Sequence, residues 1–476
     1  MSKKHDSDMT QGVVWRQILN FAVPMMIGLV FQQLYNTVDT IVVGQFVGKE
    51  ALAAVGSTGT IINMLVSLSS GLSAGAMVMI SQHFGAHNDK RLSDAVQTTI
   101  VVTFLLSVII TFAGILLVKP MLRMMQTPDD VFDAAVEYLT IYYAGIIGLI
   151  FYNMTSGIMR AVGDSRRPLY FLIFSACTNI VLDLLFVVVF KLGVAGVAYA
   201  TVLSQLLSAV LTLYVLTKTD APYAIRWRKL RISYTEFKRI LSIGLPTSIQ
   251  QAVTSFSNVF VQAYINILGS ACMAGWSTYG KLDAFVLVPM QAISLASSTF
   301  VGQNYGARQY ERSRKGVNAS LVLSEVITIA LGLIVIFFAP QLMRMFTKDA
   351  EVIEFAVLFV RIITPFYVCN CVNQIYAGAL RGIGDAIIPT VVMLASFVAF
   401  RQVFLFVNKS LFAGTETYLY GISLAYPSGW VMCTILMTIF YRKSILFKAK
   451  DGEDARALKD KLRLERKLQR SRKHKA

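Results

Sequence analysis

Charged side chains are scarce in this chain of 476 residues. Only 15% of its residues are Asp, Glu, Lys or Arg, whereas ordinary soluble domains carry about 25%. Hydrophobic residues make up 55% of the chain, and the mean hydropathy is +0.59. So few charges cannot cover a water-facing surface of this size. A soluble globular enzyme and a disordered chain are therefore excluded, and a polytopic membrane protein is predicted.

Histidine is also rare, and cysteine shows no pattern typical of a site. The chain has four histidines, none in the middle of an apolar run, and five cysteines without a C-x-x-C spacing. The cysteines lie inside apolar runs, which is typical of small core residues rather than of disulfides or metal ligands. Because no nucleophile or metal-ligand cluster is present, we expect neither a membrane-embedded enzyme nor a resident cofactor.

Long apolar runs are abundant, and twelve of them are long enough to cross a bilayer. The sequence therefore predicts an all-α polytopic membrane protein with 12 transmembrane helices. The runs cover residues 16–47, 52–82, 94–118, 133–158, 168–190, 193–217, 240–268, 271–303, 317–339, 355–380, 388–407 and 417–441.

The formal net charge of +17 is distributed unevenly along the chain. Residues 442–476 alone carry 14 basic and five acidic side chains. With the N-terminus inside, 34 basic residues fall in the inner segments and seven in the outer ones, which satisfies the positive-inside rule. We therefore expect both termini in the cytoplasm. The basic tail is expected to contact anionic lipid headgroups, and a nucleic-acid partner is not expected.

Two sequence motifs occur twice at an offset of 221 residues. G-x-x-R-x-x-G-D-x-x-x-P begins at Gly157 and again at Gly378, and Q-x-x-G-A begins at Gln82 and again at Gln303. Each half contains six predicted helices, so both halves have the same orientation, as in transporters with two parallel repeats around a V-shaped central cleft. The predicted units are the six-helix bundles 1–217 and 240–441, the cytoplasmic linker 218–239 and the basic tail 442–476.

These duplicated motifs resemble those of the multidrug and toxic compound extrusion (MATE) family, and the branch that looks nearest is the DNA-damage-inducible one. The resemblance covers nearly the whole chain except the tail. It implies a cation-coupled exporter of amphipathic, often cationic, drugs or toxic metabolites in the bacterial cell (inner) membrane. The first predicted helix adds the pattern Pro24, Gln32, Gln33, Tyr35, Asn36, Asp39, Gly44 and Gly48.

Two carboxylates of the first half lie at similar predicted depths in the membrane. Asp39 and Asp183 are about 13 Å and 12 Å from the outer ends of their helices, at 1.5 Å per residue. Asn179 shares a helix face with Asp183, and Thr201 falls at the same level. Such carboxylates cannot both stay ionised in a low dielectric without a cation, so we expect them to share protons or bind Na⁺, for which oxygen ligands are suitable.

The family resemblance also implies that Asp39, Asn179, Asp183 and Thr201 form the site that couples transport to a cation. The second half has lost these oxygen-bearing side chains, and this asymmetry favours a functional site over a structural network. At the 221-residue offset, the four positions are Phe260, Phe400, Phe404 and Ile422.

Other polar residues of the predicted helices are candidates for the substrate cleft, because flexible and aromatic side chains suit promiscuous binding. For Lys281 and Arg401 the alternative is a structural ion pair with a charged residue of the same bundle. For Arg160, Asp164, Arg381 and Asp385 we favour a capping role at the inner ends over a gating role. The cleft candidates are Tyr35, Asn36, Tyr152, Met154, Lys281 and Arg401.

The sequence thus predicts a secondary active antiporter that exchanges small molecules for H⁺ or Na⁺. We expect a monomer. The alternative is a flippase of lipid-linked saccharides with a related duplicated bundle. A flippase for pyrophosphate headgroups would need several basic residues in the cleft, and the predicted helices of the first half contain none except Arg16, which lies at the inner boundary of the first and is counted with the inner segments. Neither the substrate nor the choice between H⁺ and Na⁺ follows from the sequence.

Overall fold

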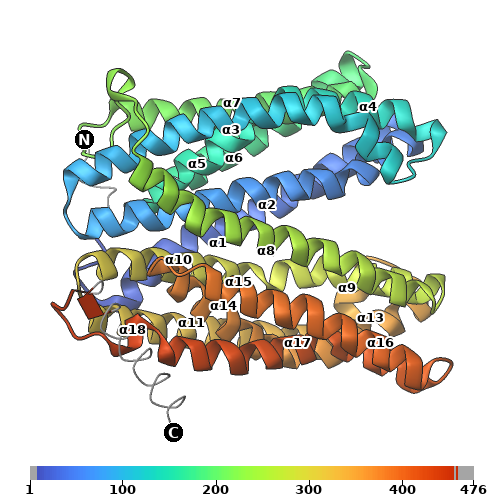
Figure 1. Ribbon diagram of the computed structural model, residues 1–476. Coiled ribbons are helices and arrows are strands. Elements are labelled where there is room, and N and C mark those ends of the chain that lie inside the picture. The colour runs from blue at the N-terminus through green and yellow to red at the C-terminus, as the bar shows by residue number, and fades with distance from the viewer. Residues whose placement is uncertain (1–7, 455–456, 459–476) are drawn as a thin grey trace, which may run out of the picture.

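The computed structural model describes residues 8–454 and 457–458, without the side chains of a few helical residues. The described chain forms two bundles of helices that lie side by side (Figure 1). The first bundle consists of α1 (Val14–Val42), α2 (Lys49–Gly85), α3 (Asp89–Met124), α4 (Asp129–Ala144), α5 (Ile146–Ala161), α6 (Arg166–Asp183) and α7 (Gly193–Lys218). The π-helical segments Val43–Val47 and Leu184–Val189 extend α1 and α6.

The second bundle follows a connection that includes the short 3-10 helix Trp227–Lys229. Two further short segments interrupt its helices, the 3-10 turn Thr364–Phe366 and the π-helical Ala395–Phe400. Its helices are α8 (Tyr234–Asn266), α9 (Ser270–Val286), α10 (Val288–Gly306), α11 (Tyr310–Phe337), α12 (Ala339–Arg344), α13 (Ala350–Ile363), α14 (Tyr367–Gly382), α15 (Ile387–Leu394), α16 (Arg401–Phe412), α17 (Glu416–Lys443) and α18 (Ile445–Lys448).

The predicted membrane helices are present, and several are broken. Within the described residues, ten helices are long and apolar enough to cross a bilayer, or eleven when α4 and α5 count as one span bent by 46° at Gly145. The remaining predicted span is α8, which is less apolar because its glutamines Gln250 and Gln251 line an internal cavity. The chain is therefore an all-α membrane protein with 12 helical spans in two repeats.

The two bundles touch along α2 and α8. A Cβ built on Gly71 would lie 2.5 Å from the backbone N of Ser248, and a Cβ on Gly75 would lie 2.7 Å from the backbone N of Gly244. Glycine is therefore required for this helix approach. Figure 1 shows the bundles close together at the end where α1 begins and farther apart at the opposite end. We call the first the inner end and the second the outer end of this V.

Two equivalent hydrogen bonds join the bundles at the inner end. Gln82 Nε2 of α2 donates to the carbonyl oxygen of Gly382 on α14, at 2.8 Å. Gln303 Nε2 of α10 donates to the carbonyl oxygen of Ala161 on α5, at 2.9 Å. The four residues are related by the 221-residue offset, so the duplicated Q-x-x-G-A motif forms a symmetric contact, which we call the inner latch.

The glycines of the same motif allow the backbones to meet at the inner latch. A Cβ on Gly85 would lie 1.9 Å from the Gln303 carbonyl oxygen, and a Cβ on Gly306 would lie 2.0 Å from the Gln82 carbonyl oxygen. Each distance is far shorter than a van der Waals contact. The inner end can therefore close in this way only with glycine at both positions.

Different groups support the two glutamines of the inner latch. Arg239 Nη2 donates to Gln82 Oε1 at 2.6 Å, and the backbone N–H of Met9 donates to Gln303 Oε1 at 2.9 Å. Beside Gln82, the buried side chains of His83 and Glu236 lie 3.0 Å apart. Burial alone would raise the pKa of Glu236, but the hydrogen bond and charge of His83, together with nearby arginines, outweigh burial and lower that pKa.

The predicted basic tail, residues 442–476, falls largely outside the described residues. Its described beginning packs on the inner end of the second bundle. Arg314 Nη1 donates to the carbonyl oxygens of Phe447 and Ala449, at 3.0 Å each, and the Tyr310 hydroxyl donates to the carbonyl oxygen of Glu453 at 3.0 Å.

Candidate functional site

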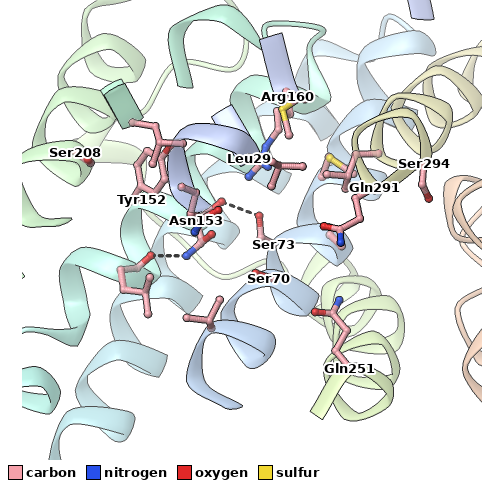
Figure 2. A pocket seen from close by; sticks show the side chains of 18 of the residues that line it. Leu29, Ser70, Ser73, Tyr152, Asn153, Arg160, Ser208, Gln251, Gln291 and Ser294 are labelled. Atoms are coloured by element: carbon pink, nitrogen blue, oxygen red, sulfur yellow. Dashed lines mark hydrogen bonds between the residues drawn. The ribbon is translucent and has the colours of Figure 1, made fainter. Parts of the chain in front are cut away.

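A cavity of about 520 Å³ lies between the two bundles. Cavities that bind small molecules commonly measure about 300–1,000 Å³. Helices α1, α2, α5, α6 and α7 of the first bundle and α8, α10 and α14 of the second line it. Figure 2 shows Tyr152 and Asn153 on one side of the cavity and Gln251 and Gln291 on the other. We call it the central cavity.

Pairs of equivalent residues from the two repeats line the central cavity. Ser73 Oγ donates to the carbonyl oxygen of Asn153, and Ser294 Oγ donates to the carbonyl oxygen of Gln374, both at 2.7 Å. These residues are again related by the offset of 221. The central cavity therefore lies on the axis that relates the two repeats.

In the duplicated G-x-x-R-x-x-G-D-x-x-x-P motif, the aspartates and the arginines have different roles. Asp164 Oδ1 accepts hydrogen bonds from the backbone N–H groups of Arg166 and Arg167 at 3.1 Å, which caps the start of α6. Asp385 Oδ1 accepts from the backbone N–H of Ile388 at 3.3 Å, at the start of α15. The capping role expected from the sequence therefore applies to the two aspartates.

The expectation of a capping role is wrong for Arg160 and Arg381. Both side chains line the central cavity, Arg160 from the end of α5 and Arg381 from the end of α14. The predicted helix 133–158 stopped short of Arg160, whereas α5 continues to Ala161. The first half therefore does place a basic side chain on the cavity, contrary to the expectation.

The predicted cleft residues of the first half divide into three groups. Tyr35 and Tyr152 line the central cavity, and the Tyr152 hydroxyl donates to the carbonyl oxygen of Pro168 at 3.1 Å. Met154 is fully buried in the core of the first bundle, because it lies on the face of α5 that packs inside that bundle. Its assignment to the cleft is thus corrected. The side chain of Asn36 lies outside the described part of the structure.

The two predicted cleft cations of the second half lie away from the central cavity. Lys281 is exposed on α9, with Nζ 5.9 Å from the Phe346 ring centroid. Arg401 is buried and donates to Ser257 Oγ at 2.8 Å and to Asn258 Oδ1 at 2.9 Å. Arg401 therefore has structural partners, but they are neutral oxygens, and the ion pair expected as the alternative is not formed among the described residues. No salt bridge of Lys281 or Arg401 is found among the described residues.

Three of the four predicted coupling residues are buried at the outer edge of the central cavity. Asn179 and Asp183 lie one turn apart on α6, and Thr201 lies on the adjoining helix α7. Asn179 also lines the cavity itself. The side chain of Asp39 falls outside the described residues, although its backbone belongs to α1, which packs against α6.

A small apolar cluster shows that the three helices place these residues at one level. Val43, Val187 and Val197 are buried together where the outer ends of α1, α6 and α7 meet. Asp39 precedes Val43 by four residues, Asp183 precedes Val187 by four, and Thr201 follows Val197 by four. Because four residues make about one helical turn, all three backbones lie one turn inward of the cluster.

The polar atoms at this level fit a small cation. Within the described part of the chain, the buried side-chain oxygen and nitrogen of Asn179 and the hydroxyl of Thr201 have no hydrogen-bond partner. Buried polar groups are nearly always paired, so such atoms are suited to hold a ligand, water or ion. Carboxylate, amide and hydroxyl oxygens are the donors that Na⁺ prefers, and a proton needs only the carboxylates.

Most of the polar residues that line the central cavity do not stand out in the amino-acid sequence. Apart from Arg160 and Arg381, these are amides and hydroxyls, and neutral side chains of this kind give no signal against an apolar background. The 221-residue offset was a usable signal, since it pairs many lining residues. The missed amide residues are Gln32, Asn153, Gln205, Gln250, Gln251, Gln291 and Gln374.

Comparison with known proteins agrees with the duplicated architecture. The MatE family model matches residues 24–185 and, separately, residues 246–407. The probable multidrug resistance protein YpnP of Bacillus subtilis is 30% identical, with 83% of this chain and 89% of that protein covered. The probable multidrug resistance protein YoeA of the same organism is 28% identical, with 90% and 94% covered.

Solved structures show the same arrangement of helices. The structure described as the outward-facing conformation of a multidrug resistance MATE family transporter of the MOP superfamily has a TM-score of 0.88 and 25% sequence identity. The likeness covers 94% of this chain and 100% of that one. Given two matches to the family model, one in each bundle, and relatives that match over most of their length, this chain belongs to the multidrug and toxic compound extrusion family of membrane transporters.

Proposed function

We propose that this multidrug efflux transporter is a secondary active antiporter, in which export of amphipathic drugs or toxic metabolites is driven by inward movement of H⁺ or Na⁺. The observation that carries the proposal is the set of unpaired buried polar atoms on Asn179 and Thr201, at the level of Asp183. The equivalent positions of the second bundle are Phe400, Phe404 and Ile422, which offer no oxygen ligand. The proposed cation site therefore lies in the first repeat.

The position of Asn179 suggests how cation binding is coupled to export. This side chain lines the central cavity and stands one helical turn from Asp183. With Asp39 at the same level, an empty site leaves negative charge in a low dielectric, and a proton or Na⁺ neutralises it. Filling the site therefore changes the wall of the cavity that holds the substrate. Such differential binding is what a ligand needs to shift the equilibrium between outward-facing and inward-facing states.

The proposal includes several finer assignments. We propose that the chain lies nearer the DNA-damage-inducible branch of the family, and the oxygen cluster in the first bundle supports this assignment. The excess of basic residues in the inner segments supports a bacterial inner-membrane location with both termini in the cytoplasm. We propose a monomer, with anionic lipid headgroups as partners of the basic tail. The alternative of a lipid-linked saccharide flippase is not favoured.

An accumulation assay in cells tests the coupling assignment. Cells would be loaded with fluorescent amphipathic compounds of different charge, and export would be followed for wild type, Asp39→Asn and Asp183→Asn at matched expression. Both variants should lose most export, because the amide cannot take up a proton or offer a carboxylate to Na⁺.

The matched control is Asp283→Asn, which alters a carboxylate of the second bundle. Asp283 accepts hydrogen bonds from Tyr279 and Tyr367 and does not line the central cavity. Its variant should export like wild type. Undiminished export by both Asp39→Asn and Asp183→Asn would remove the coupling assignment.

A further inference from the structure

The charged side chains that line the central cavity are all positive among the described residues. Arg160 and Arg381 both line it, and no Asp or Glu is among the described residues that do. The two arginines occupy equivalent positions in the duplicated motif, one in each bundle. In Figure 2 the Arg160 side chain extends into the region between Tyr152 and Gln291. This cavity therefore differs from one shaped for a cationic drug, which would have to overcome repulsion from both arginines.

The two guanidinium groups are poorly satisfied by the protein. Arg160 Nε donates to the carbonyl oxygen of Ser156 at 3.1 Å. Neither Arg160 nor Arg381 forms a salt bridge with an acidic side chain in the described ranges. A partly buried cation without an anionic partner is costly inside a membrane protein. The guanidinium donors are thus available to a ligand, and they match phosphate and carboxylate oxygens.

The rest of the cavity wall matches an amphipathic molecule. The amides of Gln250, Gln251 and Gln291 add neutral donors and acceptors, and they leave the positive charge of the cavity unchanged. Apolar side chains provide a surface for a ring or a chain. They are Met25, Leu29, Met77, Leu149, Leu172 and Leu295. One cavity therefore offers positive charge, hydrogen-bonding groups and apolar surface.

The arginines are also tied to the contact that closes the inner end. Arg160 precedes Ala161, and Arg381 precedes Gly382, whose carbonyl oxygens accept the two hydrogen bonds of the inner latch. Closing the latch ties the end of α14 to α2 and the end of α5 to α10, across the two bundles, and so holds two like charges on one cavity. Opening the latch separates the helix ends that carry them. An anion that contacts both arginines therefore stabilises the closed inner end.

We propose that the central cavity contains an anion site, in which Arg160 and Arg381 together bind the phosphate or carboxylate group of a soluble amphipathic substrate. Its apolar part lies against the methionine and leucine side chains. This inference rests on the proposed function, since it takes the central cavity as the transport cavity. It keeps the expectation of an amphipathic substrate and replaces the expectation that this substrate is often cationic.

Binding of two flavins to the purified protein in detergent tests the proposal. Riboflavin and flavin mononucleotide share one ring system, and only the second carries a phosphate. Wild type should bind flavin mononucleotide about tenfold more tightly than riboflavin, as expected for charge-assisted hydrogen bonds. Increasing salt should reduce this preference. Equal affinity of wild type for the two flavins would overturn the proposal without recourse to any variant.

Variants assign the preference to the two arginines. Arg160→Gln and Arg381→Gln should each abolish most of the preference for flavin mononucleotide and leave riboflavin binding unchanged, while Arg160→Lys should retain part of it. Arg361→Gln is the control, because Arg361 is exposed on α13 and does not line the cavity. A preference that survives in both cavity variants would contradict the assignment.

Two further measurements separate the possible sources of the anion and the two proposals. Short-chain phosphatidic acid should displace flavin mononucleotide poorly. Displacement as strong as that by unlabelled flavin mononucleotide would assign the site to a lipid headgroup and overturn the soluble substrate. Asp183→Asn should keep the flavin preference, since the anion site does not include Asp183. If Asp183→Asn loses coupled export but still prefers flavin mononucleotide to riboflavin, both proposals are supported. If Asp183→Asn loses this preference, the anion site and the cation site are not separate.

Discussion

At the scale of single residues, location on a helix decides which of two nearby polar groups is functional. Asp164 and Arg160 belong to one motif, yet the aspartate caps a helix and the arginine lines the central cavity. Tyr152 and Met154 are two residues apart on α5, and only the tyrosine lines that cavity. Residue type alone therefore predicts neither role, because a shift of two positions turns a side chain by about 200° around a helix.

Glu236 provides a prediction on stability at this scale. Its carboxylate is buried against His83, and its pKa is lowered because the hydrogen bond and positive charges outweigh burial. A lowered pKa stabilises the folded state above the pKa of the unfolded chain, and this stabilisation is lost as the pH falls through the folded value. Glu236→Gln should therefore cost about 1–3 kcal/mol at neutral pH.

Thermal unfolding in detergent at several pH values checks this prediction. The difference in Tm between wild type and Glu236→Gln should shrink at acidic pH, once the wild-type carboxyl is protonated. Glu311→Gln is a suitable control, because Glu311 is exposed and pairs with Lys315 at the surface. A Tm difference that stays constant from neutral to acidic pH would contradict the account of Glu236.

At the scale of helices, periodicity and length predicted every membrane span, but not where the spans break. The predicted span 133–158 consists of two helices with a bend at Gly145. Helix α8 has a lower hydropathy than the other spans, because glutamines interrupt its apolar face. The candidate coupling set could be predicted because carboxylates in an apolar run are conspicuous. Arg160 was missed because the predicted helix ended two residues before it, and amides such as Gln291 were missed because they carry no charge.

The inner latch yields a prediction about the equilibrium between conformations. In Gly85→Ala and Gly306→Ala the added Cβ would lie 1.9 Å and 2.0 Å from a carbonyl oxygen of the other bundle. The closed inner end should therefore become unfavourable, and the bundles should separate there. Spin labels on Lys90→Cys and Glu311→Cys, two exposed and repeat-related positions, would report longer distances in both variants.

Gly280→Ala is the matched control for the latch. A Cβ on Gly280 would meet no atom within 4 Å, so the label distances should match those of wild type. Unchanged distance distributions in Gly85→Ala and Gly306→Ala would show that the glycines are not required for closure at the inner end.

At the scale of the whole molecule, the features that follow the repeat differ in role from the one that does not. The inner latch, the serine pairs and the two cavity arginines obey the 221-residue repeat and come from both bundles. The oxygen cluster around Asp183 breaks the repeat and belongs to the first bundle. Symmetric parts suit a cavity that opens alternately to two sides, and the proposed cation site would let one bundle respond to the cation gradient.

Transport in reconstituted vesicles tests this division most directly. Vesicles that contain wild type or Asp183→Asn would receive a Na⁺ gradient at constant pH, and in separate samples a pH gradient without Na⁺. Accumulation of a compound exported in the cell assay would be measured beside its gradient-free exchange. The account predicts that one of the two gradients drives accumulation by wild type, and that Asp183→Asn loses this accumulation but retains exchange. Accumulation by Asp183→Asn at the wild-type rate under the same gradient would contradict it.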